Sequence, residues 1–178
     1  MLDRLSKLLL MSGVIALLVF AATDVQAQVR FGPQVAWGSD TDLGIGARLT
    51  GDVDAFGGSD SSALRSLRGI AEFIYYLDPH DGCDECSALE INASGVVPIK
   101  LGESNNDFYA GGGLNLARFS VDIGGAGSVS NTEIGLNVLG GLNFALSNLA
   151  AFVEAGIRIS GSEQFVISSG ITFGGGGN

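Results

Sequence analysis

The sequence predicts an all-β chain built from eight amphipathic strands. Segment 133–144, EIGLNVLGGLNF, shows the pattern most clearly, because its even-numbered residues are apolar or glycine and most of its odd-numbered residues are small or polar. Successive residues of a strand point to opposite faces, so a period of two separates an apolar face from a polar one. Seven other segments resemble it, and clusters of Gly, Ser, Asn and Asp separate most of them.

The expected strands follow one another along the whole chain after residue 28. They are 29–37, 43–52, 69–77, 88–97, 108–119, 133–144, 151–159 and 164–173. Turn-forming residues at 38–42, 102–107, 124–132, 146–148 and 160–164 separate them, whereas the connection 53–68 is long and only 61–67 could form a short helix. Pro33 lies inside the first segment and has no N–H to donate, which predicts a start of that strand near Gln34.

The charged residues of these strands share the polar face, which favours a transmembrane barrel over a soluble sandwich. Segment 133–144 would rise roughly 28 Å at about 3.3 Å per residue and a tilt of about 45°, against an apolar band about 25 Å tall. With the apolar face outward, a soluble barrel or sandwich would bury these charged residues in its core, where unpaired charges are very costly. In a small membrane barrel polar side chains fill the interior instead. The predicted lumen charge network consists of Arg30, Arg48, Glu72, Glu90, Glu133, Glu154 and Arg158.

Aromatic residues near the strand ends fit two interfacial girdles on the apolar face. One set contains Phe31, Phe108, Phe144 and Phe173, and the other contains Trp37, Tyr75 and Phe165. Phe119 and Phe152 have the parity of the polar face, so they fit a girdle only if bulges intervene.

The first 27 residues have the pattern of a secretory signal peptide. Arg4 and Lys7 precede the apolar stretch 8–22, and small residues at 25–27 suit cleavage before Gln28. We therefore expect a signal peptide at 1–27, one barrel domain at 28–178 and export of the chain. The formal charge of −10 argues against nucleic-acid binding, because Lys and Arg are few and scattered singly.

His80, Cys83 and Cys86 form the sharpest local motif, LDPHDGCDECS. A closed metal site needs about four ligands and a redox pair needs a stabilised thiolate, which neighbouring acidic residues oppose. A Cys83–Cys86 disulfide in an outward loop is the favoured interpretation. His80 is the single histidine and no GxSxG-type motif accompanies it, so neither an enzyme nor a bound cofactor is expected.

Four stretches give the chain a family resemblance: RFGPQVAWGSDTDLGIGARL, FYAGGGLNLARF, NTEIGLNVLGGLNF and FVISSGITF. With them the chain resembles the small outer-membrane β-barrels of Gram-negative envelopes, of the OmpA transmembrane-domain, OmpX and opacity-porin type. The resemblance implies an eight-stranded antiparallel up-and-down barrel in the outer-membrane bilayer. It also implies insertion by the assembly machinery that recognises a C-terminal strand ending in an aromatic residue. Phe173 has that position, and residues 174–178 follow it.

The expected function is a structural or surface-interaction role of a monomeric barrel with an Arg/Glu-filled lumen, with loops such as 78–87 and 121–132 facing outward. Glu154 and Arg158, four residues apart on one inward face, are expected to belong to a structural ion-pair network. A small porin-like channel and a secreted soluble ligand-binding barrel are the alternatives. The second would need large apolar residues inside, where Gly, Asn, Glu and Arg are found.

Overall fold

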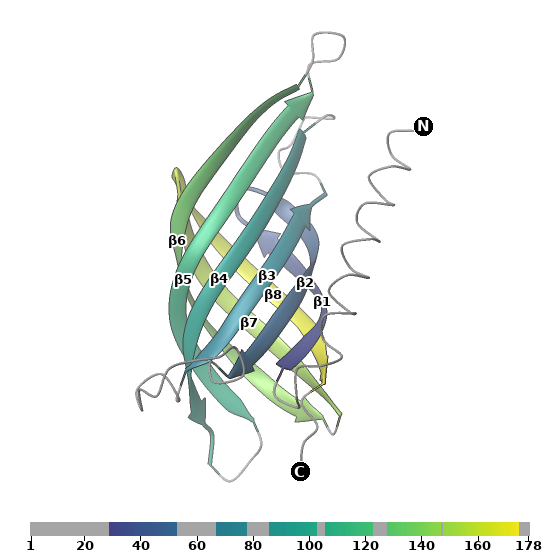
Figure 1. Cartoon of the computed structure of the whole chain (residues 1–178), viewed down its shortest axis with the longest axis vertical. Helices are drawn as coiled ribbons and strands as arrows, with labels where there is room; N and C mark the ends of the chain where they lie inside the picture. Colours follow the sequence, from purple (N-terminus) through teal and green to yellow (C-terminus); the bar gives the residue numbers. More distant parts are fainter. Residues whose placement is uncertain are drawn as a thin grey trace.

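The computed structural model describes residues 29–52, 67–77, 86–102, 106–122, 128–146 and 148–174, which form a closed antiparallel barrel (Figure 1). The strands are β1 (Val29–Gly38), β2 (Asp42–Asp52), β3 (Arg68–Tyr76), β4 (Cys86–Lys100), β5 (Asp107–Asp122), β6 (Ser128–Leu146), β7 (Leu149–Ser160) and β8 (Ser162–Gly174). Each strand pairs with its sequence neighbours, and β1 pairs with β8. The predicted eight-stranded up-and-down barrel is confirmed.

None of the described residues belongs to a helix long and apolar enough to cross a membrane. The predicted signal peptide, the possible helix at 61–67 except Leu67, His80 and Cys83 lie outside the described residues. The signal peptide and the domain boundary at 27/28 therefore stay predictions.

Closure of the barrel depends on the pairing of its first and last strands. Phe31 lies opposite Phe173, and at the other end of the same seam Gly38 lies opposite Val166. A closed barrel leaves no strand edge along this wall with unpaired backbone groups. We call the end of the barrel that holds Val29 and Gly174 the terminal end, and the opposite end the distal end.

The alternation of polar and apolar residues in the sequence corresponds to the alternation of inward and outward side chains in the barrel wall. In β4, Glu90, Asn92 and Ser94 are buried inside the barrel, whereas Ile91 and Val97 are 47% exposed on its outer surface. The same period of two holds in the other strands, because inward and outward side chains alternate in a closed sheet. Large apolar residues therefore form the outer surface, and polar residues with some small apolar ones form the interior.

Two apolar clusters lie inside the barrel, one toward each end. The distal cluster consists of Ala36, Ile74, Tyr76, Ala88 and Val166, with Phe119 packed against it. The terminal cluster consists of Ile70, Val96, Tyr109 and Leu139. Phe119 thus faces inward, as its parity requires, and packs against this cluster in a regular ladder, so it is not part of an outer girdle.

The predicted loop boundaries are wrong at the distal end, where β4, β5 and β6 are longer than expected. Cys86 pairs with Val121 and Ser128 pairs with Asp122, so the ends of the predicted loops 78–87 and 121–132 are strands. β6 first pairs with β7 at Leu136, which leaves 128–135 beyond the rim of β7. Ser and Asn are poor strand signals on their own, but pairing with a neighbouring strand overrides this preference. This distal extension is the tall hairpin of β5 and β6 in Figure 1.

The prediction of a start near Gln34 is also wrong, because β1 begins at Val29. Pro33 faces outward and lies opposite Ala47 of β2. In the described residues, the β1–β8 register has no pair at Gly32 and Pro33. The missing N–H of Pro33 therefore interrupts one ladder locally and does not end the strand.

Hydrogen exchange should distinguish the distal extension from the barrel wall. Amides of 128–132 should exchange faster than amides of 136–142 in the same strand, because they have a neighbouring strand on one side only. Mass-spectrometric deuterium exchange on the folded chain measures both. Equal protection of the two segments would contradict a projecting sheet.

Candidate functional site

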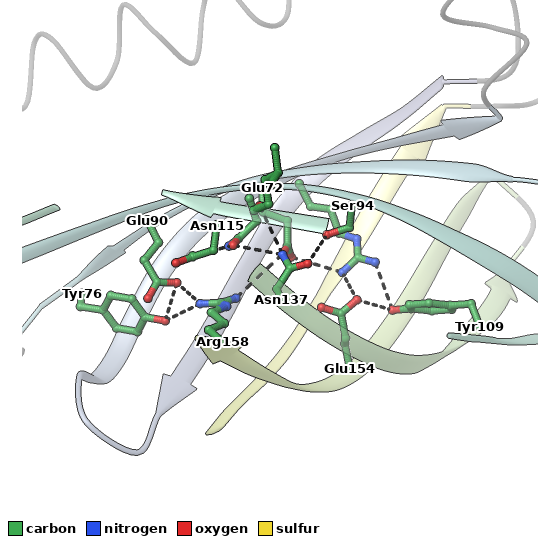
Figure 2. A network of polar contacts seen from close by, with 12 residues as sticks. Glu72, Tyr76, Glu90, Ser94, Tyr109, Asn115, Asn137, Glu154 and Arg158 are labelled. Carbon is green, nitrogen blue, oxygen red and sulfur yellow. Dashed lines mark hydrogen bonds and ion pairs between the residues drawn. The ribbon is translucent and has the colours of Figure 1, made fainter. Parts of the chain in front are cut away.

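The interior cluster fills the middle of the barrel. It consists of five charged residues, two tyrosines and four smaller polar residues from six strands: Arg48, Glu72, Tyr76, Glu90, Asn92, Ser94, Tyr109, Asn115, Asn137, Glu154 and Arg158. All of these side chains belong to residues that are at most 7% exposed. Figure 2 shows Tyr76 and Tyr109 at opposite ends of the cluster, with the other labelled side chains between them.

Arg48 of β2 is the centre of the first group of contacts. Its Nη1 lies 2.9 Å from Oε2 of Glu154 on β7, and its Nη2 donates to the Tyr109 hydroxyl of β5 at 3.1 Å. That hydroxyl donates to the same Glu154 oxygen at 2.9 Å. The ring centroid of Phe152 lies 4.1 Å from the guanidinium carbon, a cation–π distance. Phe152 therefore faces inward without a bulge, as its parity requires, and covers a buried charge.

Arg158 of β7 repeats this arrangement toward the distal end. Its Nη1 pairs with Oε2 of Glu90 on β4 and donates to the Tyr76 hydroxyl of β3 at 2.8 Å. The Tyr76 hydroxyl lies 3.4 Å from the same carboxylate oxygen, to which it donates. The interior thus contains two groups of one arginine, one glutamate and one tyrosine, each joining three strands.

Glu72 of β3 links the two groups. Oε1 of Glu72 lies 3.3 Å from Nη1 of Arg48, and Oε2 lies 3.9 Å from Nη2 of Arg158. The side chain of Glu72 is 1% exposed. Buried carboxylates and guanidiniums lose several kcal/mol of hydration each, so they need partners of opposite charge and further hydrogen bonds. With all five groups ionised, three carboxylates and two guanidiniums leave one negative charge.

Amide and hydroxyl side chains continue the cluster across β4, β5 and β6. Asn92 Oδ1 accepts from Asn115 Nδ2 at 2.7 Å and from Asn137 Nδ2 at 3.3 Å. Ser94 Oγ donates to Asn137 Oδ1 at 3.1 Å. Among the described residues, Glu90 Oε1 and Asn92 Nδ2 have no hydrogen-bond partner, and ordered water commonly occupies such positions in polar interiors.

Little empty space remains around these side chains. A cavity of about 10 Å³, lined by Glu72, Glu154, Arg158 and Ser168 among others, lies in the cluster. That volume suits about one water molecule. The side chains that line this cavity therefore leave little space between them.

Glycines on neighbouring strands make room for the inward aromatic rings. Tyr109 lies opposite Gly141 in the β5–β6 ladder, and a Cβ built at Gly141 would overlap the Tyr109 hydroxyl. The other two pairs are Tyr76 opposite Gly44 and Phe152 opposite Gly170, where a Cβ would lie 2.9 Å from a ring carbon. Each ring fills the volume that its cross-strand glycine leaves free.

The structure brings five of the seven predicted charged residues together and leaves two apart. Arg30 lies in β1 at the terminal end and makes no ion pair among the described residues, and Glu133 lies in the distal extension. The Glu133 carboxylate accepts from Asn131 Nδ2 at 2.8 Å. Glu154 and Arg158 share a face, as expected, but they pair with different partners: Glu154 with Arg48, and Arg158 with Glu90 and Glu72.

Sequence reasoning missed the uncharged half of the cluster. Tyr76 has the same inward parity as Glu72 on β3, and Tyr109 has the same inward parity as Asn115 on β5, so parity could have identified both tyrosines. It also missed an ion pair near the terminal end, where Arg68 Nη1 lies 2.8 Å from Asp107 Oδ2. Distance along the barrel and across its lumen depends on register, which a period of two does not give.

Most residues of the loop motif LDPHDGCDECS lie outside the described residues. Cys86 begins β4 and is not a free thiol, and its predicted partner Cys83 is among the undescribed residues, so their disulfide stays a prediction. No group of three or more His, Cys, Asp or Glu residues that could hold a metal ion occurs in the part of the chain that the structure describes.

Arg48→Ala should destabilise the folded barrel by about 3–5 kcal/mol, because it leaves buried Glu72 and Glu154 without this cation. Arg30→Ala removes an arginine that has no ion pair among the described residues and is the matched control, with an expected effect below about 1 kcal/mol. Urea unfolding in lipid vesicles, followed by tryptophan fluorescence, measures the free energy of unfolding. Equal losses for the two variants would show that the interior pairs contribute no stability.

Gly141→Ala should cost about 1–3 kcal/mol, because the new Cβ forces Tyr109 away from Arg48 and Glu154. Gly95→Ala is the control, since a Cβ at Gly95 meets nothing within 4 Å. The same unfolding assay compares them. The explanation by ring overlap fails if Gly95→Ala is as destabilising as Gly141→Ala.

Comparison with known proteins finds similarity in structure. No protein-family model and no curated protein sequence matches the chain. Neisserial surface protein A matches with a TM-score of 0.58 and 22% identity over 82% of this chain and 95% of that one. The N-terminal barrel of Pseudomonas aeruginosa OprF has a TM-score of 0.60 and 12% identity, covering 83% and 97%. Ail, the attachment invasion locus protein of Yersinia pestis, has a TM-score of 0.56 and 11% identity, covering 82% and 95%. The chain therefore has the fold of the small eight-stranded outer-membrane β-barrels.

Proposed function

We propose that this chain is an outer-membrane β-barrel with a structural or surface-interaction role, and that its interior cluster closes the lumen. The observation that carries the proposal is the chain of buried contacts from Tyr76 through Arg158, Glu72 and Arg48 to Tyr109. Side chains from six strands meet there, with a cavity of about 10 Å³ beside them. An eight-stranded barrel is just wide enough for side chains to fill its interior.

The outer surface supports placement in a bilayer. Large apolar side chains such as Leu114, Leu136 and Val138 are 58–61% exposed around the barrel. Soluble monomers rarely present an apolar surface of this extent. A lipid-facing band accounts for it, with outward Trp37 and Phe165 toward the distal end and Phe173 toward the terminal end as interfacial residues.

The distal extension supports a surface-interaction role. β4, β5 and β6 continue beyond the rim of β7, so a sheet continuous with the anchored wall would project from the membrane. Export by the signal peptide 1–27, insertion by the outer-membrane assembly machinery and a monomeric state belong to this proposal. In this proposal the protein has a binding or structural role, and no residue is given a catalytic role.

Fractionation tests the placement first. The mature chain should fractionate with outer membranes and change its mobility in SDS gels on boiling, because a closed barrel resists SDS until it is heated. A chain that stays soluble in the periplasm with no mobility shift would refute membrane insertion and leave a soluble ligand-binding barrel.

Planar-bilayer recording tests closure. The wild type should show no steady ion-conducting steps, whereas the double variant Arg48→Ser with Glu154→Ser should, because it removes both members of a buried pair and opens the lumen. Arg30→Ser is the control that keeps the interior cluster intact. Steps of the same size in the wild type and the double variant would favour the porin-like alternative.

A further inference from the structure

The outer surface of the distal extension changes from apolar to polar at one level on three neighbouring strands. On β5, exposed Arg118 is the first polar outward residue after Leu114 and Leu116. On β6, exposed Thr132 has the same position after Ile134, which is 76% exposed. On β4, Ser87 follows Leu89 in the same way toward the distal end. The boundary of the apolar band therefore crosses β4, β5 and β6 at these residues.

The register gathers the polar residues of this boundary around one cation. Arg118 lies opposite Thr132 on β6, and Ser120 lies opposite Ser130 on β6 and Ser87 on β4. These residues share the outward face because an antiparallel ladder places directly opposed side chains on the same side. We call Arg118, Ser87, Ser120, Ser130 and Thr132 the outer polar patch.

Arg118 is the cation available on this face. Its Nη2 donates to Ser130 Oγ at 3.3 Å, its one side-chain hydrogen bond within the described ranges. A guanidinium has five N–H donors in a planar fork that matches a phosphate group. The other described cations are elsewhere: Arg48 and Arg158 in the interior cluster, Arg68 paired with Asp107, and Arg30 and Lys100 at the terminal end.

We propose that the outer polar patch binds the phosphate headgroup of a membrane lipid, with Arg118 as the anion ligand and the serine and threonine hydroxyls as additional donors. The inference rests on the proposed placement in the outer membrane. A lipid fits better than a soluble anion because the patch adjoins the apolar residues Leu116 and Ile134, along which acyl chains would lie. The chain carries a net charge of −10, so a phosphate is attracted by this local cation and repelled by the molecule as a whole.

Lipid titration tests the proposal directly. The full mature chain, folded in maltoside micelles, is titrated with phosphatidic acid and, separately, with diacylglycerol of the same acyl chains, and bound lipid is counted by native mass spectrometry. Phosphatidic acid should bind and diacylglycerol should not. Arg118→Gln should weaken binding about ten-fold, the size of a lost charge-assisted hydrogen bond. Arg118→Lys should bind phosphatidic acid with an affinity between those of the wild type and Arg118→Gln, because it keeps the positive charge and loses the planar set of guanidinium donors.

Controls separate this site from general charge effects. Lys100→Gln removes one positive charge at the terminal end and should leave phosphatidic acid binding unchanged. Unchanged binding by Arg118→Gln, or equal binding of diacylglycerol, would overturn the proposal. If inorganic phosphate at the same concentration displaces phosphatidic acid, the ligand of the outer polar patch is a free anion and the proposal of a lipid is wrong. The SDS mobility shift of each variant confirms folding, and membrane fractionation is measured separately, so lipid binding can fail while the proposed membrane placement stands.

Discussion

Glu72 lies between two guanidiniums that would otherwise be separate, and the interior of the barrel depends on this contact. Both arginines are buried, so each needs a counter-charge among the inward side chains of other strands. That requirement ties β2, β3, β4 and β7 together through their side chains as well as through their backbones. The tyrosines and Phe152 then complete the surroundings of the charges, and the glycines opposite them provide the volume.

The fold could be predicted because its main signal is local. Alternation in 133–144 and its seven counterparts identifies strands and faces without any knowledge of the neighbouring strand. The distal boundaries could not be predicted in the same way. Residues 128–132 carry Ser, Asn and Thr, which read as a turn, and they are strand because β5 pairs with them. At Pro33 the local loss of an N–H predicts a late start of the strand, whereas the continuous ladder to β2 keeps this residue inside β1.

The candidate site could also be predicted only in part, because the sequence pattern is local. A period of two tells which side chains face inward, but position along the barrel and partners across the lumen follow from register and tilt. Arg30 and Glu133 face the same side as Arg48 but lie toward opposite ends of the barrel, away from its partners. Glu154 and Arg158 are near in sequence yet bind different groups, because each extends across the lumen toward the opposite charge.

The seam between β1 and β8 joins the two ends of the described barrel. Phe31 and Phe173 are 142 positions apart in sequence and adjacent in the sheet. Every other ladder forms between strands that are consecutive in the chain, so this seam carries the largest loop-closure entropy of the fold. A chain that ends before β8 exposes two unpaired strand edges, one on β1 and one on β7. Backbone groups of other molecules can pair with both edges. The barrel of this protein can therefore close only when its last strand is available.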